Sequence, residues 1–366
     1  MSGAAKNSSL SAAKAARQDE FYTQLADIER ELKHYKKHFK GKTVYLNCDD
    51  PRVSNFFHYF SFNFERLGLK KLIAACYKSQ DVDLFSSGDS ERAIWLEYEG
   101  DKNGSGVPDP EEIGVHHFSG DGDFRSPESI ELLNQADIVV TNPPFSLFRE
   151  YVTQLMEHDK KFILIGPSGA ITYKELFPFF KENKIWLGHG FQSGNAFFAT
   201  RHSADDYAKG VYNSETGLVK FRNVSWFTNL DIAKRHEELV LYRPYDPYMH
   251  PTYDNHDAIE VSRVKDIPVD YDGAMGVPIT FMEHHNPEQF EILGITKTWS
   301  GNATKKYPTQ RQISANGAVT EVSKLNDGAT LKIGTPPVGK TYYSVGDELF
   351  IQTYPRILVR RKAASK

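Results

Sequence analysis

The sequence predicts a doubly wound α/β domain followed by a smaller, β-rich C-terminal region. From about residue 19 to residue 230, short runs dominated by apolar residues alternate with segments of helical spacing. Runs such as 44–48 and 137–141 are typical of parallel strands buried on both faces. Strands that alternate with helices in this way indicate a sheet with helices on both sides. Beyond residue 240 the alternation gives way to proline, glycine and short β-prone stretches.

The individual elements follow from the same patterns. We expect helices over residues 19–39, after Asp49-Asp50-Pro51, and over 127–135, 146–157 and 173–181. We expect strands over 44–48, 72–75, 93–98, 115–118, 137–141, 162–165, 185–187, 195–200 and 223–227, and in the C-terminal region over 331–333, 349–353 and 357–359. Three prolines between Tyr242 and Pro251 mark a boundary. The prediction is a flexible arm (1–18), an α/β domain (19–240) and a C-terminal domain (241–366).

Composition and length exclude several classes of protein. The chain has 366 residues, of which 40% are hydrophobic and 25% charged, as in soluble globular proteins. No apolar run approaches the ~20 residues that a membrane helix needs, so we expect no membrane partner. Cys48 and Cys76 are the only cysteines, and no Cys/His spacing resembles a zinc site. We therefore expect a cytoplasmic protein without a disulfide framework or a metal ion.

Residues 137–145, Asp-Ile-Val-Val-Thr-Asn-Pro-Pro-Phe, carry the clearest chemical signal. In an open α/β sheet, ligands bind beyond the carboxyl ends of the strands, where Asn142 is expected. The following proline keeps Asn142 out of the helical region, and Pro143 and Pro144 fix two successive φ angles. The result is a rigid pair of acceptors, the Asn142 side-chain oxygen and the Pro143 carbonyl.

Such a pair suits an exocyclic aromatic amine, which has two N–H donors to offer. Binding both hydrogens favours the localised nitrogen lone pair that attacks a methyl group, a case of preorganised electrostatic catalysis. Phe145 supplies a flat face on which the base can stack. By themselves the four residues Asn142 to Phe145 admit adenine, guanine or glutamine as substrate, and a plain strand-ending turn is the alternative without a function.

Four further blocks carry a resemblance to a known family. They are Asp19-Glu20-Phe21-Tyr22-Thr23-Gln24, Asn-Cys-Asp-Asp-Pro-Arg-Val-Ser-Asn-Phe-Phe at 47–57, Cys76-Tyr77-Lys78-Ser79-Gln80, and Asn-Val-Ser-Trp-Phe-Thr-Asn-Leu at 223–230. The loop resembles the (Asp/Asn/Ser)-Pro-Pro-(Tyr/Phe) motif of amino-group methyltransferases. Together the blocks are similar to the EcoRI-type adenine-specific DNA methyltransferases, from about residue 19 to the C-terminus and most densely before residue 231.

The resemblance implies a Rossmann-like methyltransferase sheet, a C-terminal target-recognition domain and the gamma order of motifs. It implies transfer of the methyl group of S-adenosyl-L-methionine to N6 of adenine in double-stranded DNA, after the base is flipped out of the duplex. We expect the protein to be a monomer. It would act either as the modification enzyme of a restriction-modification system, beside a cognate restriction endonuclease, or as a phage or orphan methylase. Two other functions stay open: a ribosomal-RNA guanine-N2 or protein glutamine methyltransferase, and an inactive DNA-binding relative.

Two segments near the start of the chain are candidates for the methionine end of the cofactor. The resemblance implies that Phe21, Tyr22 and Thr23 close over it. Asp49 and Asp50 follow the first strand, where a carboxylate can accept from the cofactor's ammonium group, although Asp49 also suits a helix N-cap. Pro-Arg at 51–52 replaces the usual Gly-x-Gly turn, which leaves the position of the methionine tail open.

The adenine of the cofactor is expected at a different loop. In related enzymes, an acid followed by an aromatic residue after the third parallel strand holds this adenine, which indicates Asp123 and Phe124. A glycine-rich surface turn is the alternative for residues 120–124.

Two groups of residues are candidates for DNA contacts. Trp226 and Phe227 either form the second wall of the base pocket or are buried core aromatics. A basic group in a stretch without acids follows later, and it either contacts DNA phosphates or is a plain surface loop. That group consists of Lys297, Lys305, Lys306 and Arg311.

Overall fold

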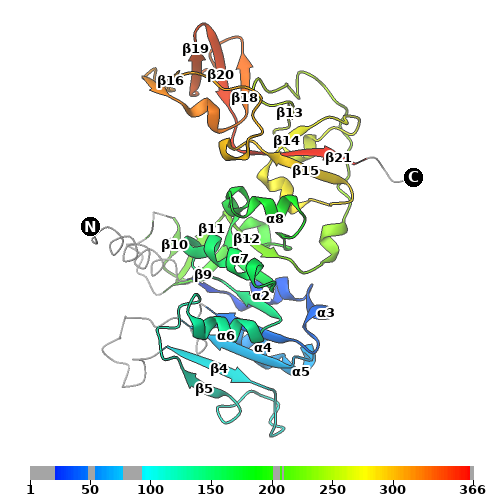
Figure 1. The fold of residues 1–366 in the computed structure, drawn as a ribbon, viewed down its shortest axis with the longest axis vertical. Coiled ribbons are helices and arrows are strands. Elements are labelled where there is room, and N and C mark those ends of the chain that lie inside the picture. The colour runs from blue at the N-terminus through cyan, green and yellow to red at the C-terminus, as the bar shows by residue number, and fades with distance from the viewer. Residues whose placement is uncertain (1–20, 48–53, 77–92, 201–206, 208–209, 363–366) are drawn as a thin grey trace. The chain divides into compact units, whose positions relative to one another are not determined.

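The chain divides into two compact units in the computed structural model, which describes residues 21–47, 54–76, 93–200, 207 and 210–362 (Figure 1). The N-terminal unit consists of Met1–Ala170 and Ile185–Ile232, and the C-terminal unit of Ile171–Lys184 and Ala233–Lys366. The main division thus falls slightly before residue 240. Among the described residues, no helix is both long enough and apolar enough to cross a bilayer.

An eight-stranded sheet forms the centre of the N-terminal unit, in the order β5-β4-β3-β2-β6-β7-β12-β8. Its strands are β2 (Thr43–Asn47), β3 (Lys71–Ala75), β4 (Ile94–Tyr98), β5 (Gly114–His117), β6 (Ile138–Thr141), β7 (Lys161–Pro167), β8 (Trp186–Leu187) and β12 (Val224–Thr228). The four central strands β3, β2, β6 and β7 are parallel. β4 is antiparallel to β3 and β5, and β12 is antiparallel to β7 and β8. The unit is therefore mixed α/β with a mixed sheet.

The antiparallel strand β4 lies between β3 and β5, so β5 runs in the same direction as β3 but does not pair with it. The chain passes from β4 to β5 through residues 99–113, all of which are described and none of which is helical. Parallel neighbours need a longer crossover, usually a helix, whereas antiparallel neighbours need only a loop. An apolar run reports that a strand is buried and not which way it runs, so the pattern could not reveal this.

Helices cover both faces of the sheet. They are α2 (Leu25–Leu32), α3 (Lys36–Phe39), α4 (Asn55–Phe62), α5 (Phe64–Leu67), α6 (Pro127–Gln135) and α7 (Phe148–Glu157). Ile28 of α2 and Phe56 of α4 share one hydrophobic cluster with Val140 of β6. On the opposite face, Phe148 of α7 packs against Phe227 of β12, with ring centroids 4.9 Å apart. The sequence patterns predicted this two-sided cover.

A small antiparallel sheet in the same unit joins the N-terminal segment to a later hairpin. Its order is β1 (Tyr22–Thr23), β9 (Ala196–Ala199), β11 (Leu218–Phe221) and β10 (Tyr212–Asn213). Tyr22 pairs with Ala199, and Thr23 pairs with Phe198. The predicted helix over 19–39 thus gives way to a short strand before α2, and β10 and β11 were not predicted.

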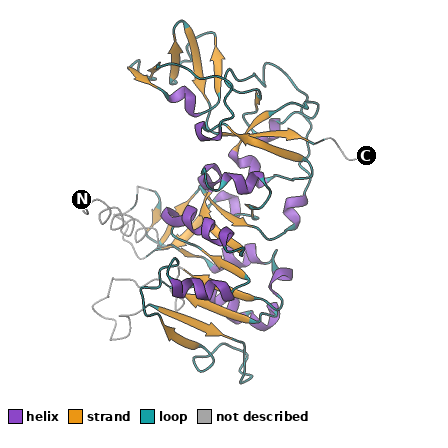
Figure 2. Ribbon diagram, in the orientation of Figure 1, coloured by secondary structure: helices purple, strands orange, loops and turns teal. Residues whose placement is uncertain are grey.

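The C-terminal unit consists mostly of strands and loops, whereas most helices belong to the N-terminal unit (Figure 2). One sheet has the order β13 (Ile259–Glu260), β14 (Met275–Pro278), β21 (Arg356–Arg361) and β15 (Phe290–Ile295). The other has the order β17 (Val319–Val322), β16 (Gln310–Ile313), β19 (Tyr342–Val345), β20 (Glu348–Gln352) and β18 (Thr330–Ile333). This architecture agrees with the predicted β-rich region.

The helices of the C-terminal unit are short. α8 (Phe177–Lys181) lies in this unit, although the sequence placed it in the first domain. The described 3-10 helices of the whole chain are η1 (Phe145–Leu147), η2 (Ser168–Thr172), η3 (Gln192–Gly194), η5 (Ala233–His236), η6 (Val264–Asp266), η7 (Ile279–Glu283), η8 (Thr298–Ser300) and η9 (Lys324–Asp327).

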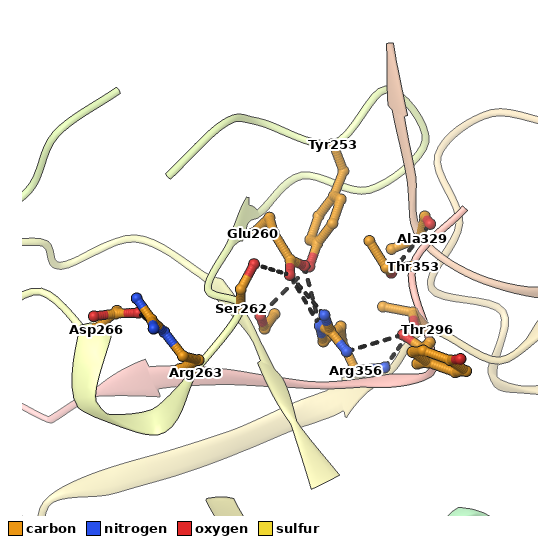
Figure 3. Close-up of polar contacts among 11 residues, drawn as sticks. Tyr253, Glu260, Ser262, Arg263, Asp266, Thr296, Ala329, Thr353 and Arg356 are labelled. Atoms are coloured by element: carbon orange, nitrogen blue, oxygen red, sulfur yellow. Dashed lines mark hydrogen bonds and ion pairs between the residues drawn. The ribbon is translucent and has the colours of Figure 1, made fainter. Parts of the chain in front are cut away.

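A buried ion pair joins two strands of the C-terminal unit (Figure 3). Arg356, at the start of β21, donates from Nη2 to Oε1 of Glu260 at 2.7 Å and from Nε to Oε2 at 3.1 Å. Ser262 Oγ donates to the same Oε1 at 3.0 Å, and the Tyr253 hydroxyl donates to Oε2. The pair therefore connects β21 to β13 across β14, and because Glu260 is buried, losing its partner is costly.

Candidate active site

The predicted catalytic loop lies at the carboxyl end of a central strand. β6 is buried along its whole length and lies between β2 and β7. Asn142 follows β6 directly, and Pro143 is buried beside it. Pro144 is extended, with ψ of 128°, and leads into η1 at Phe145. A rigid strand and a helix therefore hold both ends of the loop.

The Asn142 side chain is buried, with 6% of its surface exposed, and its amide is held in one orientation. Its Nδ2 donates to the main-chain carbonyl of Phe21 at 2.7 Å. A carbonyl oxygen can only accept, so the NH₂ end of the amide must face Phe21. The other end, Oδ1, is buried and has no hydrogen-bond partner among the described residues. Because a buried unpaired acceptor is costly, this oxygen is suited to a donor supplied by a ligand.

Phe145 belongs to a group of four phenylalanine rings around the loop. Its ring centroid lies 6.1 Å from those of Phe21 and Phe221 and 6.5 Å from that of Phe198. Phe198 and Phe221 come from β9 and β11, and the sequence did not single them out. The only signal was the Phe-Phe pair within the expected strand at 195–200, and the pairing of that strand with β11 could not be inferred from it.

The N-terminal segment presents alternate residues to this group. Phe21 and Thr23 are buried, whereas Tyr22 is partly exposed and, by the alternation of a strand, points to the opposite face. Thr23 Oγ1 is buried and has no hydrogen-bond partner among the described residues. The Thr23 carbonyl accepts from Asn55 Nδ2 at 2.7 Å. Of the three predicted residues, Phe21 and Thr23 therefore face the catalytic loop.

Asp123 and Phe124 lie in the loop after β5, which packs against the end of β3. Gly122, with φ of +76°, comes so close that an added Cβ would lie 2.7 Å from the Cys76 carbonyl oxygen. Arg125 holds the Asp123 carboxylate, from Nε to Oδ1 at 2.8 Å and from Nη2 to Oδ2 at 2.7 Å. Burial raises the pKa of Asp123, but the bonds from Arg125 outweigh this, and the pKa lies below its usual range.

Two interactions connect the predicted adenine loop to the helix that follows the catalytic loop. Arg125 reaches Glu150 of α7 at 3.2 Å, and its guanidinium lies 5.1 Å from the centroid of the Phe124 ring. The Phe124 ring packs edge-on against Tyr151 of α7, with centroids 5.1 Å apart. Arg125 and Tyr151 were not predicted, because neither belongs to a motif.

The end of β2 lies beside the end of β6, which leads into the predicted catalytic loop. Asn47, its last residue, accepts from the Thr141 hydroxyl at its carbonyl and from the Tyr151 hydroxyl at its side-chain oxygen. The predicted cofactor residues Asp49 and Asp50 lie outside the described residues. Within the described part of the chain, no three His, Cys, Asp or Glu side chains are grouped so that they could hold a metal ion.

Trp226 and Phe227 are core residues, which corrects their assignment to DNA. Trp226 is fully buried and stacks on Phe191, with ring centroids 5.7 Å apart. Phe227 is 1% exposed and packs against Phe148 on the other face of the sheet. β12 is covered on both faces, so neither ring is accessible to a base. The block 223–230 therefore supports the sheet.

The four basic candidates of the C-terminal unit fall into two pairs. Lys305 forms an ion pair with Asp254 at 2.6 Å, and Lys297 forms one with Asp327 at 3.6 Å. Lys306 and Arg311 are exposed, and neither forms an ion pair with a described residue. A phosphate contact requires a cation that is not already neutralised, so Lys306 and Arg311 are the stronger candidates.

Comparisons with known proteins show the family to which the chain belongs. The family model described as "Adenine-specific methyltransferase EcoRI" matches residues 9–362. The Type II methyltransferase M.EcoRI of Escherichia coli is 50% identical over 297 residues, which cover 80% of this chain and 90% of that protein. M.MgeORF184P of Mycoplasma genitalium is 37% identical over 337 residues, covering 86% of this chain and 92% of the relative.

A third relative, the Type II methyltransferase M.MpnI of Mycoplasma pneumoniae, is 40% identical over 286 residues, which cover 77% of this chain and 83% of the relative. No solved structure was found to match the chain. The family match spans the predicted catalytic loop, both segments predicted to bind the cofactor, and the C-terminal unit up to residue 362. The chain therefore belongs to the EcoRI-type adenine-specific methyltransferase family.

Proposed function

We propose that the chain is an S-adenosyl-L-methionine-dependent DNA methyltransferase that modifies adenine at N6. The observation that carries the proposal is the buried Asn142 Oδ1, which has no partner among the described residues although its Nδ2 is engaged. Membership of the family supports the substrate class and the methyl donor. The parallel central strands, with the loop at their carboxyl end, support a Rossmann-like arrangement of the sheet.

In the proposed reaction, the loop makes the adenine amino group more nucleophilic. Asn142 Oδ1 and the Pro143 carbonyl accept its two hydrogens, which localises the nitrogen lone pair for attack on a methyl carbon. Phe145 supports the ring by stacking. The acceptors are fixed before the base arrives, because the Phe21 carbonyl holds the Asn142 amide and the two prolines hold the backbone.

The cofactor, when bound, supplies an electrophilic methyl group. Two features of the chain fit it. Thr23 Oγ1 is buried and has no partner among the described residues, so it can bond the methionine end. Asp123, kept ionised by Arg125, can accept from the amino group of the cofactor's adenine, with Phe124 beside the ring. Asp49 and Asp50 complete the proposed set, as acceptors for the ammonium group.

The target base must leave the duplex to reach Asn142, since a paired adenine presents its amino group inside the stack. We assign target recognition to the C-terminal unit, with Lys306 and Arg311 as phosphate contacts. The Type II names of the relatives support a role as the modification enzyme of a restriction-modification system.

The test is transfer of tritiated methyl groups from S-adenosyl-L-methionine to duplex DNA, followed by digestion to nucleosides. Label in N6-methyladenine is the expected result. Label in RNA or protein with none in DNA would place the substrate elsewhere, and no transfer despite cofactor and DNA binding would mean an inactive relative. Either result would overturn the proposal.

A further inference from the structure

Two asparagine side chains hold the outer edge of the N-terminal strand β1. Asn142 donates to the Phe21 carbonyl and Asn55 donates to the Thr23 carbonyl, each at 2.7 Å. Carbonyls two residues apart in a strand point to the same side. β1 pairs with β9 along its other side. The two amides thus take the place of a neighbouring strand along the free edge of β1.

The two asparagines differ in what else they can do. Asn142 belongs to the catalytic loop, whereas Asn55 is the first residue of α4. Asn55 is partly exposed, and its side-chain amide donates to the main-chain carbonyl of Thr23. Its amide therefore ties the helix that follows the first strand β2 to the segment that covers the catalytic loop.

We propose that Asn55 is a positioning residue for methyl transfer, and this inference rests on the proposed function. By holding the Thr23 carbonyl, Asn55 keeps β1 against the loop. The Phe21 carbonyl then holds the Asn142 amide with Oδ1 available to the base, and Thr23 Oγ1 stays in place for the cofactor. Without this tie, β1 leaves the loop more often, and the Asn142 amide can turn over and present NH₂ where an acceptor is needed.

Asn55→Asp is the variant that separates positioning from support of the helix. The substitution keeps the size of the side chain, but a carboxylate cannot donate to the Thr23 carbonyl. At the first position of a helix, an acid interacts favourably with the helix dipole, so α4 itself is not weakened. If Asn55 served only the helix, the variant would be as stable and as active as the wild type.

Asn63→Asp is the matched control at the opposite end of this helix, where Asn63 is the C-cap of α4. Asn63 Nδ2 donates to the Tyr59 carbonyl at 2.7 Å at the other end of α4 and does not touch β1. An acid there is unfavourable at the C-terminus of α4 and loses the hydrogen bond to Tyr59, although Asn63 is also the N-cap of α5, to which its side chain makes no capping bond. We therefore expect Asn63→Asp to lower the thermal midpoint and to leave the affinity for S-adenosyl-L-methionine unchanged.

Three measurements on the full chain test the proposal: hydrogen exchange in peptides covering residues 21–23 and 196–199, calorimetric affinity for S-adenosyl-L-methionine, and kcat and KM on duplex DNA. For Asn55→Asp we expect faster exchange in both peptides and a loss of roughly 5- to 150-fold in cofactor affinity and in kcat/KM, the usual range for a buried group left unpaired. The thermal midpoint should fall no further than that of Asn63→Asp, and the affinity for DNA should not change. Asn55→Gln, which retains the donor, should recover part of the loss.

Wild-type exchange in both peptides of Asn55→Asp would overturn the proposal, as would wild-type cofactor affinity. A loss shared equally by Asn63→Asp would also overturn it, since helix stability would then explain both. The exchange measurement needs neither cofactor nor DNA. If the wild-type chain transfers no methyl group to DNA, the proposed function fails, and exchange still decides whether Asn55 holds β1.

Discussion

In Asn142→Asp an oxygen takes the place of Nδ2, and the rest of the side chain is unchanged. We expect this variant to bind S-adenosyl-L-methionine more weakly, although the side chain at position 142 need not touch the cofactor. The motif that the loop resembles admits Asp at this position. In this chain, however, Nδ2 lies 2.7 Å from the Phe21 carbonyl. A carboxylate placed there sets two acceptors against each other at a buried position. We therefore expect β1 to separate from the loop and the affinity for S-adenosyl-L-methionine to fall.

The size of the effect follows from the buried carbonyl that loses its donor. Leaving such a group unpaired costs about 1–3 kcal/mol, which corresponds to roughly 5- to 150-fold in affinity if only the closed form of β1 binds the cofactor. Asn142→Ala should differ. It opens a space that a water molecule can enter and bond to the Phe21 carbonyl. Turnover should be lost in both variants, and cofactor affinity mainly in the Asp variant.

Calorimetry with S-adenosyl-L-methionine on the wild type and both variants provides the assay. Burial raises the pKa of a carboxyl group, and in the Asp variant the protonated carboxyl would again donate to the Phe21 carbonyl. Affinity of the Asp variant should therefore recover, relative to the wild type, as the pH falls. Wild-type affinity of Asn142→Asp at neutral pH would refute the idea that the Phe21 carbonyl orients this side chain.

Further predictions concern stability. Arg356→Met should lower the free energy of unfolding by about 3–5 kcal/mol, because it leaves the buried Glu260 carboxylate without its partner; a denaturant titration checks this, and the double variant with Glu260→Gln should be less destabilised. Burial lowers the pKa of His285 to about 4, below the usual 6.5. Between these two pH values the unfolded chain binds a proton at His285 that the folded chain does not bind. The free energy of unfolding should therefore decrease as the pH falls from 6.5 to 4. Thermal melts across this range should show a weaker pH dependence in His285→Gln and an unchanged one in the exposed control His284→Gln. Gly166→Ala would place a Cβ 2.2 Å from the ring of Phe148, the first residue of α7. The variant should lose about 1–3 kcal/mol of folding free energy, as a thermal melt would show, and it should have a lower turnover in a methyl-transfer assay.

Local chemistry explains what could be predicted from the sequence. A residue before proline at the end of an apolar strand has few conformations, so the position of Asn142 followed from four neighbouring residues. The strands themselves could be located because apolar runs report burial. The direction of the strands could not be predicted from these runs. For this reason the sequence did not reveal that β4 is antiparallel to β3. Sequence patterns therefore predict the secondary structure of a segment more readily than the strand with which it pairs.

Long-range pairing explains what was missed at the site. The sequence did not distinguish a pocket role from a core role for Trp226, because strand register decides which face is covered. Lys305 could not be recognised as paired, since Asp254 lies 51 residues away in sequence. Phe198 and Phe221 meet Phe21 only because β1, β9 and β11 form one sheet. The bond from Asn142 to Phe21 likewise spans 121 residues.

We propose that Asn142 supports methylation of adenine in DNA. Methylation-aware sequencing of DNA from cells that express the protein, beside cells that express Asn142→Ala, tests it most directly. We expect N6-methyladenine at one recurring DNA sequence with the wild-type protein and none with the variant. Modification of another base, absence of modification with the wild type, or equal modification with Asn142→Ala would contradict it.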